Sequence, residues 1–251
     1  MDPTPLPRWS GAPERPKVRA VPPRVAIVIP ALNEEDALPL VLADIPSSLG
    51  ATVVVVDNGS TDRTAEVARE AGATVVTEPA RGYGGACLAG IQHLAGLPHS
   101  PDVLIILDAD HADDPGLLPE LFVKPITDGD VDLVLSTRTL GGAEPGSMTP
   151  VQRWGNELQI ALLRLRFGLH LTDMGPMRAI RWDALQSLSM RDRTWGWNVE
   201  MACKAARNGL RVREVPVPYR RRVGVSKISG SLSGVVRAGG KILYAFAKYG
   251  R

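Results

Sequence analysis

The sequence has few cysteines and no long apolar run, and both absences narrow the kind of protein that it encodes. Cys87 and Cys203 are the only cysteines among 251 residues, and they show neither metal-ligand spacing nor a disulfide framework. We therefore expect buried, reduced thiols in a cytoplasmic protein. No apolar stretch approaches the ~20 residues that cross a bilayer, and the N-terminus lacks the apolar core of a signal peptide. We expect a protein that does not span the membrane but can lie on its surface.

A net charge of only +2 conceals an uneven distribution. From Lys204 onward the chain carries twelve lysines and arginines against one acid, Glu214. A basic C-terminal part predicts an anionic partner, either a phosphate group or a membrane surface. Aromatic residues are sparse there and no nucleic-acid-binding module is visible, so we expect no nucleic-acid partner.

The fingerprint of a dinucleotide-binding fold is also missing. Residues 24–30 form a β-branched run closed by Pro30, which predicts a first strand, and Asn33 is a candidate cap for a helix reaching Leu49. A Gly-x-Gly-x-x-Gly turn would be expected between them in that fold, and there is none. We therefore expect no phosphate to be held at this first turn.

Two carboxylates follow a continuous apolar run. Residues 103–107 are apolar and lead directly into Asp108 and Asp110, a pattern typical of a strand buried on both faces. Side chains two apart on a strand point the same way, here toward the edge where open α/β sheets bind ligands. Such a pair suits Mg²⁺ or Mn²⁺ carrying a diphosphate. The alternative is a helix cap and a turn, since Asp113 and Asp114 follow.

The remaining pattern alternates strands with helices. Further strands are predicted at 52–57, 73–77 and 131–136, with helices between them. This order predicts an α/β fold with a doubly wound, mainly parallel sheet and helices on both faces. Asp57 ends its strand as Asp108 does, so both can lie on one sheet edge, although a simple turn role for Asp57 stays open.

Three segments are candidates for binding anions or surfaces. The glycine-rich stretch after Arg81 opens a helix, which favours an anion site, although such turns are common. Residues 220–227 hold four cations and a serine and can wrap a phosphate or form a solvated loop. Residues 231–251 predict an amphipathic helix that packs on the domain, on a partner subunit or on a membrane. The proline-rich residues 1–23 predict a disordered leader.

Taken together, the chain resembles glycosyltransferase family 2, in particular the dolichyl- and polyprenyl-phosphate glycosyltransferases. The likeness covers residues 24–230 and rests on three motifs in family order: residues 30–34, residues 56–62 and Asp108-Ala109-Asp110. It implies a GT-A fold for that range, a nucleotide-diphosphate sugar as donor and Mg²⁺ or Mn²⁺ as cofactor.

The resemblance also implies roles for individual residues. The implied donor-binding residues are Pro30, Ala31, Glu34, Asp57, Gly82, Asp108 and Ala109, and the implied metal ligands are Asp108 and Asp110. The implied catalytic residues are Asp108, Asp110, Arg138 and Glu200, and the acceptor-binding residues are Arg153, Asp173, Arg222, Ser226 and Lys227.

The sequence departs from the family pattern at two positions. Relatives carry an amide-type metal ligand where this chain has Ala112, so water, His111 or Asp113 must complete the metal shell. Asn58 replaces a frequent second aspartate of the nucleoside site.

The class of acceptor is inferred from the absence of a clear catalytic base in the sequence. A hydroxyl acceptor needs a carboxylate base, and the Glu-Asp pair of base-using relatives is missing; only Glu200 could take that role. A phosphate acceptor is already anionic and needs cations such as Arg222 and Lys227. We therefore expect inverting transfer to a polyprenyl phosphate by an enzyme attached to the cytoplasmic face of the membrane, as a monomer or homo-oligomer. The alternatives are a soluble or hydroxyl acceptor, a nucleotidyltransferase, and a non-catalytic nucleotide-sugar-binding module.

Overall fold

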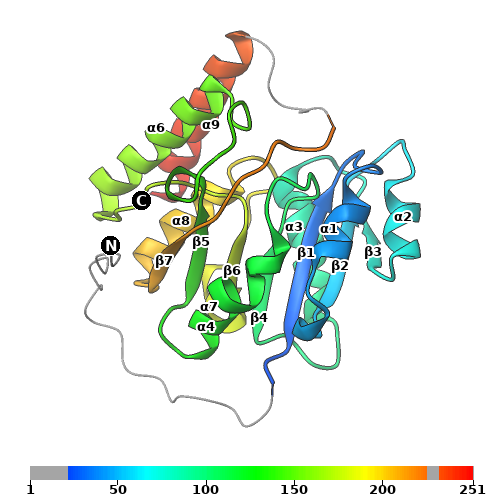
Figure 1. Ribbon diagram of the computed structural model, residues 1–251. Coiled ribbons are helices and arrows are strands. Elements are labelled where there is room, and N and C mark those ends of the chain that lie inside the picture. Colours follow the sequence, from blue (N-terminus) through cyan, green and yellow to red (C-terminus); the bar gives the residue numbers. More distant parts are fainter. Residues whose placement is uncertain (1–21, 225–231, 251) are drawn as a thin grey trace.

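A seven-stranded sheet of order β3-β2-β1-β4-β6-β5-β7 forms the centre of the molecule (Figure 1). The computed structural model describes residues 22–224 and 232–250. The predicted leader, apart from residues 22 and 23, and the implied ligands Ser226 and Lys227 lie outside this part. The strands are β1 Val25–Ala31, β2 Thr52–Asp57, β3 Thr74–Thr77, β4 Val103–Ile106, β5 Leu133–Thr137, β6 Arg178–Arg181 and β7 Val212–Pro216.

The strands are parallel except β6, which runs antiparallel to both β4 and β5. Central β4 is buried along its whole length, as its unbroken apolar sequence predicts. Strand β7 lies at the edge of the sheet, with Pro216 at its end, where no ladder donor is needed.

Helices cover both faces, which confirms the predicted doubly wound α/β architecture. The helices are α1 Leu38–Asp44, α2 Thr64–Glu70, α3 Tyr83–Ala95, α4 Lys124–Thr127, α5 Arg138–Gly141, α6 Pro150–Phe167, α7 Trp182–Leu188, α8 Trp197–Arg207 and α9 Leu232–Tyr249, with the short turns η1 Ser47–Leu49, η2 Pro115–Leu117 and the π-helical η3 Leu118–Val123. Alternate residues of the central strands feed two cores, one with α3, α7, α8 and α9 and one with α1, α2, η3 and α4.

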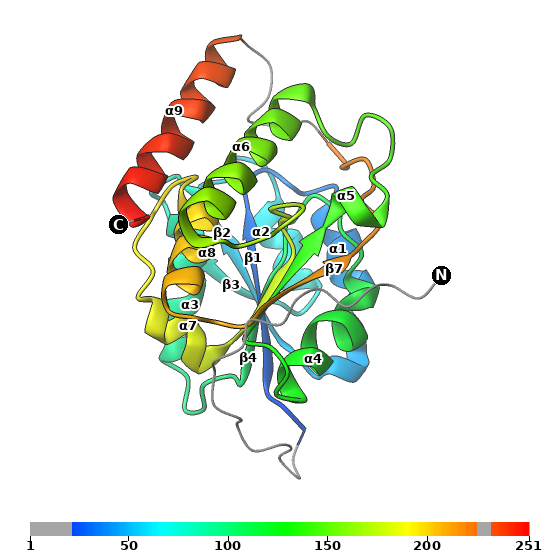
Figure 2. The same ribbon diagram turned by 90° about the vertical axis from the view of Figure 1, so that its left-hand side faces the viewer.

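Two long helices, α6 and α9, lie side by side at one end of the sheet (Figure 2). The predicted C-terminal helix therefore packs on its own domain, with Ala245, Phe246 and Tyr249 buried. Both cysteines are buried free thiols, as expected.

The structure corrects two local predictions near the sheet edge. Helix α1 begins only at Leu38, because Asn33 adopts a left-handed backbone (φ 53°) and its side chain accepts the Thr61 amide at 2.7 Å instead of capping a helix. Strand β4 ends at Ile106, so loop contacts rather than strand alternation orient Asp108 and Asp110.

Candidate active site

Asp108 and Asp110 follow β4 at the carboxyl edge of the sheet. Asp110 is buried; its Oδ1 accepts the Ala112 amide at 3.1 Å and its Oδ2 lies 3.2 Å from Arg222 Nη2. The Tyr83 hydroxyl donates to Asp108 Oδ1 at 3.2 Å. Burial, and then the charge of Asp110, raises the pKa of Asp108 to about 6. Two neighbouring carboxylates of this kind are suited to hold a divalent cation.

The segment after β7 runs back along the edge of the sheet (Figure 1) and hydrogen-bonds to the backbone of the Asp-x-Asp turn. The Val223 amide donates to the carbonyl of Asp110 at 3.0 Å, and the Arg220 amide donates to that of Ala112 at 2.8 Å. Arg222 also reaches Glu34 at 3.5 Å. The described part of the basic loop is therefore held on the Asp-x-Asp turn.

A second set of ion pairs fixes the outside of the same turn. Arg220 contacts Asp114 at 3.1 Å and Asp44 of α1 at 3.6 Å. His111 has a left-handed backbone (φ 60°), and its ring is 2.8 Å from Asp44. The His111 side chain is thus directed to α1, which argues against its role as a metal ligand.

The implied donor residues of the first two strands lie together. Ala31 pairs with Asp57 in the β1–β2 register, so the two strands end side by side. Asp57 Oδ1 accepts the Ser60 amide at 2.9 Å, and the Glu34 amide donates to Thr64 Oγ1 at 2.8 Å. Pro30, Ala31, Glu34 and Asp57 therefore share one sheet edge with the Asp-x-Asp turn.

The glycine-rich turn is not the anion site that the sequence favoured. The Gly84 and Gly85 amides at the start of α3 donate to the carbonyls of Thr194 and Arg193, at 3.1 and 2.9 Å. The Gly82 amide donates to Asn58 Oδ1 at 2.8 Å. Protein acceptors therefore take the amides that a phosphate at this turn would need, while the implied contact of Gly82 with the donor stays a prediction.

Asp173 is not available to an acceptor, contrary to its implied role. It is fully buried and binds the guanidinium of Arg138 through both oxygens, at 2.7 and 2.8 Å. Burial opposes the charge of Arg138, but the bonds to Asp173 raise its pKa above the usual value. Tyr219 covers this guanidinium at 5.1 Å. Arg138 thus ends β5 in a fixed ion pair.

Glu200 cannot serve as a base where it lies. Its side chain is fully buried, accepts the amides of Arg191 and Asp192 at 3.0 and 2.7 Å, and pairs with Lys204 at 2.7 Å. The prediction of a catalytic Glu200 is therefore wrong, and the residue holds the loop before α8. Arg153, another predicted ligand, is exposed on α6.

The sequence reading missed two residues beneath the carboxylates. Tyr83 was passed over as a member of a glycine-rich turn, although it binds Asp108. Arg178 begins β6 opposite Ile106 of β4 and is almost fully buried, with its guanidinium on the carbonyls of Gly175 and Pro176. Burial lowers the pKa of Arg178. The positive charge of Arg178 offsets part of the rise in the pKa of Asp108 that burial and Asp110 cause. An arginine opening a buried strand was the signal that could have indicated it.

Asp113 is the one buried acid here whose role no contact explains. It is 3% exposed, and neither of its oxygens meets a hydrogen-bond partner within residues 22–224 and 232–250. Burial, and then the charges of Asp108 and Asp110, raise the pKa of Asp113 well above the usual value. Asp113 is thus a buried carboxyl group next to Asp108 and Asp110 that has no hydrogen-bond partner among the described residues.

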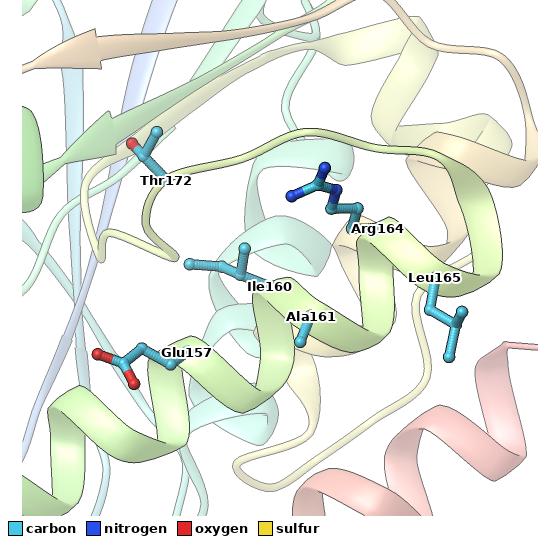
Figure 3. Close-up of a pocket in the computed structure, with 6 residues that line it drawn as sticks. All are labelled: Glu157, Ile160, Ala161, Arg164, Leu165 and Thr172. Carbon is cyan, nitrogen blue, oxygen red and sulfur yellow. The ribbon is translucent and has the colours of Figure 1, made fainter.

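An open groove of about 640 Å³ runs along α6 (Figure 3). Ile160, Ala161 and Leu165 give it apolar walls, and Arg164 points across it. It reaches Thr172, whose hydroxyl lies 2.8 Å from that of Thr137, the residue before Arg138. The groove thus leads from the outer helix toward the end of β5.

Comparison with known proteins assigns the chain to a family. The family described as Glycosyl transferase family 2 matches residues 26–189, so the chain belongs to it and is a glycosyltransferase. An uncharacterised glycosyltransferase of Mycobacterium tuberculosis is 42% identical over 216 residues, which cover 85% of this chain and 94% of the relative.

Two named relatives are similar over most of the chain. A dolichyl-phosphate hexose transferase of Haloferax volcanii is 37% identical, covering 81% of this chain and 86% of its own. An undecaprenyl-phosphate mannosyltransferase of Micrococcus luteus is 33% identical, covering 84% and 90%.

The fold is also that of a solved enzyme. Glucosyl-3-phosphoglycerate synthase of Mycobacterium tuberculosis, crystallised with Mn²⁺, UDP-glucose and phosphoglyceric acid, superposes with a TM-score of 0.71 at 24% identity, over 91% of this chain and 80% of that one. The predicted GT-A fold is thereby confirmed.

Proposed function

We propose that this glycosyltransferase moves a sugar from a nucleoside diphosphate sugar to the phosphate of a polyprenyl phosphate, with Mg²⁺ or Mn²⁺ at Asp108 and Asp110. One observation carries the choice of acceptor. The Arg222 guanidinium lies at the Asp-x-Asp turn, whereas Glu200, the one carboxylate that could have served as a base, is fully buried in an ion pair with Lys204. A phosphate acceptor has no proton to lose and needs only cations to place it.

The residues present fit a divalent cation. Burial, and then the charge of Asp110, raise the pKa of Asp108 to about 6, and a bound cation would relieve both costs of ionising this carboxyl. Nowhere in residues 22–224 and 232–250 do three or more His, Cys, Asp or Glu side chains converge as a metal site. The protein would therefore supply two carboxylates, and diphosphate oxygens and water the rest, as is usual for Mg²⁺. The cation's contribution is to neutralise the leaving diphosphate.

The donor nucleoside is proposed to lie over the ends of β1 and β2. Pro30, Ala31, Glu34 and Asp57 share this edge with the Asp-x-Asp turn, so a diphosphate at the turn leaves its nucleoside beside them. The UDP-glucose bound by the glucosyl-3-phosphoglycerate synthase supports a nucleotide sugar as the donor class.

Arg222 is proposed to change partners during binding. It now pairs with Asp110 and Glu34. If Asp110 held the cation, Arg222 would be free to leave this carboxylate and to bind the acceptor phosphate through its guanidinium. An acceptor oxygen would then attack the anomeric carbon from the face opposite the leaving diphosphate, inverting the configuration.

The outer helices support a lipid acceptor. Helix α6 exposes Trp154 and Leu165, the latter to 86%, and α9 exposes Leu243 beside it. Arg153 and Arg164 lie on the exposed side of α6. Apolar and basic residues together on one surface are typical of helices in a membrane interface. In the described ranges no helix combines the length and the apolarity needed to cross a bilayer, so we propose peripheral attachment at the cytoplasmic face.

A soluble phosphate acceptor is the second candidate. It is favoured by the phosphoglyceric acid in the complex of the solved enzyme of this fold. The two candidates share the phosphate that Arg222 would position and differ in the lipid that the α6 groove would receive.

A matched pair of lipids tests the requirement for phosphate. The protein is incubated with Mn²⁺, a panel of nucleotide sugars and vesicles containing either undecaprenyl phosphate or undecaprenol. We expect a glycolipid from the phosphate and none from the alcohol. Transfer to the alcohol would require an active base and would contradict the proposal.

A further inference from the structure

The 191–196 loop lies between the C-terminal helix and the start of α3. The carbonyls of Arg193 and Thr194 accept the first free amides of α3. A Cβ at Gly82 or Gly84 would overlap the loop backbone, so glycine is needed there for the loop to dock this closely. The glycine-rich turn thus packs against the backbone of the 191–196 loop, and its Gly84 and Gly85 amides are not available to a phosphate.

At its inner end the loop reaches the candidate metal site. Trp195 stacks on Tyr83 with ring centroids 6.2 Å apart and an interplanar angle of 18°. The Tyr83 hydroxyl donates to Asp108. Trp195 is 49% exposed, so one face of a large apolar ring stays in solvent while the other backs Tyr83.

At its outer end the loop is tied to α9. Asp192 Oδ1 accepts the amide and hydroxyl of Thr194 at 2.7 and 2.9 Å, which closes the loop on itself. Asp192 Oδ2 accepts the Tyr249 hydroxyl of α9 at 3.2 Å. Lys204, which pairs with Glu200, lies 5.7 Å from the Tyr249 ring centroid.

We propose that the 191–196 loop is a positioning element that fixes the first metal-binding carboxylate from the C-terminal helix. Tyr249 holds Asp192, the loop holds Trp195 on Tyr83, and Tyr83 orients Asp108. Tyr83, Trp195, Asp192 and Tyr249 are positioning residues, and the inference rests on the cation site of the proposed function.

Hydroxyl deletions test this chain of contacts. Mn²⁺ binding to the full-length protein is measured by electron paramagnetic resonance, in the presence of UDP or GDP, for wild type, Tyr83→Phe, Tyr249→Phe and the double variant, with melting temperatures alongside. Tyr244→Phe is the control, because Tyr244 lies on α9 but is 65% exposed. We expect each deletion at Tyr83 or Tyr249 to weaken Mn²⁺ binding by about three- to tenfold, the effect of one oriented hydrogen bond.

The double variant separates one chain of contacts from two independent effects. We expect the double variant to bind Mn²⁺ no more weakly than Tyr83→Phe alone. Without the Tyr83 hydroxyl, no hydrogen bond in the described part of the chain connects the loop to Asp108, so the loss of the Tyr249 hydroxyl has no further effect there. We also expect Trp195→Phe to keep more of the affinity than Trp195→Ala.

Three outcomes would overturn the inference. Multiplied effects in the double variant would show independent sites, and unchanged affinities in the single variants would show a loop of structural importance only. In both cases wild type still binds Mn²⁺ and the proposed function stands. If wild type binds no Mn²⁺ with either nucleotide, the proposed function fails as well.

Discussion

Arg222 Nη2 lies 3.2 Å from Asp110 Oδ2, so a guanidinium from the basic loop pairs with the second carboxylate of the Asp-x-Asp turn. The same guanidinium reaches Glu34, which joins the turn to the loop after β1. Arg222 and a divalent cation would therefore compete for Asp110.

Replacing Arg222 should change metal binding and turnover in opposite directions. In Arg222→Gln, Asp110 loses its competitor, and we expect Mn²⁺ without nucleotide to bind about two- to fivefold more tightly, as suits a partly exposed ion pair. Transfer to lipid phosphate should fall at least about tenfold, because a charge-assisted contact is lost. Calorimetric Mn²⁺ titration and a transfer assay measure the two effects.

The neighbouring arginine is the control for that prediction. Arg221 holds the carbonyl of Pro145 through its side chain, so Arg221→Gln should leave Mn²⁺ affinity unchanged. A loss of both affinity and turnover in Arg222→Gln would show that Arg222 supports the turn and does not compete with the cation.

Removing the Asp108 charge should stabilise the protein while abolishing metal binding. Because the pKa of Asp108 is about 6 in the folded protein against a usual 3.8, the folded state holds the proton more tightly. The free energy of unfolding contributed by this group therefore falls as pH rises from about 4 through about 6, by at most about 3 kcal/mol.

In Asp108→Asn no carboxyl group titrates at this position, so this fall in the free energy of unfolding with rising pH is absent. Without metal at pH 7.5 we expect a higher melting temperature than in wild type, and near pH 4 no difference. Mn²⁺ with nucleoside diphosphate should raise the melting temperature of wild type only. Equal melting curves for the two proteins across this pH range would contradict the assigned pKa.

Removing one member of the buried Arg138–Asp173 ion pair should destabilise the fold more than replacing both members by apolar residues. Asp173→Ala leaves Arg138 buried without its partner, which costs about 3–5 kcal/mol. We expect Arg138→Met combined with Asp173→Leu to cost much less, since no charge is left unpaired. Urea unfolding measures both; a double variant as unstable as the single one would show that the pair itself is essential.

An exposed leucine on α6 should matter for membrane binding and not for stability. Leu165 is 86% exposed, so Leu165→Ser should unfold like wild type but bind anionic vesicles more weakly. Leu40→Ser on α1, where Leu40 is 44% exposed, is the matched control and should bind as wild type does. Vesicle flotation at low and high salt measures the effect, and equal losses in both variants would disfavour α6 as the contact surface.

The layers of the fold were predictable because local sequence determines them. The run of valines ending at Asp57 predicted β2 with the bounds that the structure shows. The apolar residues before Asp108 predicted a strand buried on both faces, as β4 is. The antiparallel direction of β6 was not predictable, because it depends on pairing with the distant strands β4 and β5.

Site residues were predictable only where position along a strand decides them. Asp57, Asp108 and Asp110 lie at the sheet edge because their strands end there. The anion site at the glycine-rich turn and the catalytic role of Glu200 were predicted wrongly, because backbone groups of the 191–196 loop bind the Gly84 and Gly85 amides and the Glu200 carboxylate. A local pattern of residues contains no information on such contacts.

The most direct test of the account lets two acceptors compete. Full-length protein, Mn²⁺ and the accepted nucleotide sugar are mixed with equal amounts of undecaprenyl phosphate in vesicles and phosphoglycerate in solution, and both products are measured by mass spectrometry. The account predicts that the mass of one sugar is added to the lipid phosphate. A sugar found on phosphoglycerate, or on neither acceptor, would contradict it.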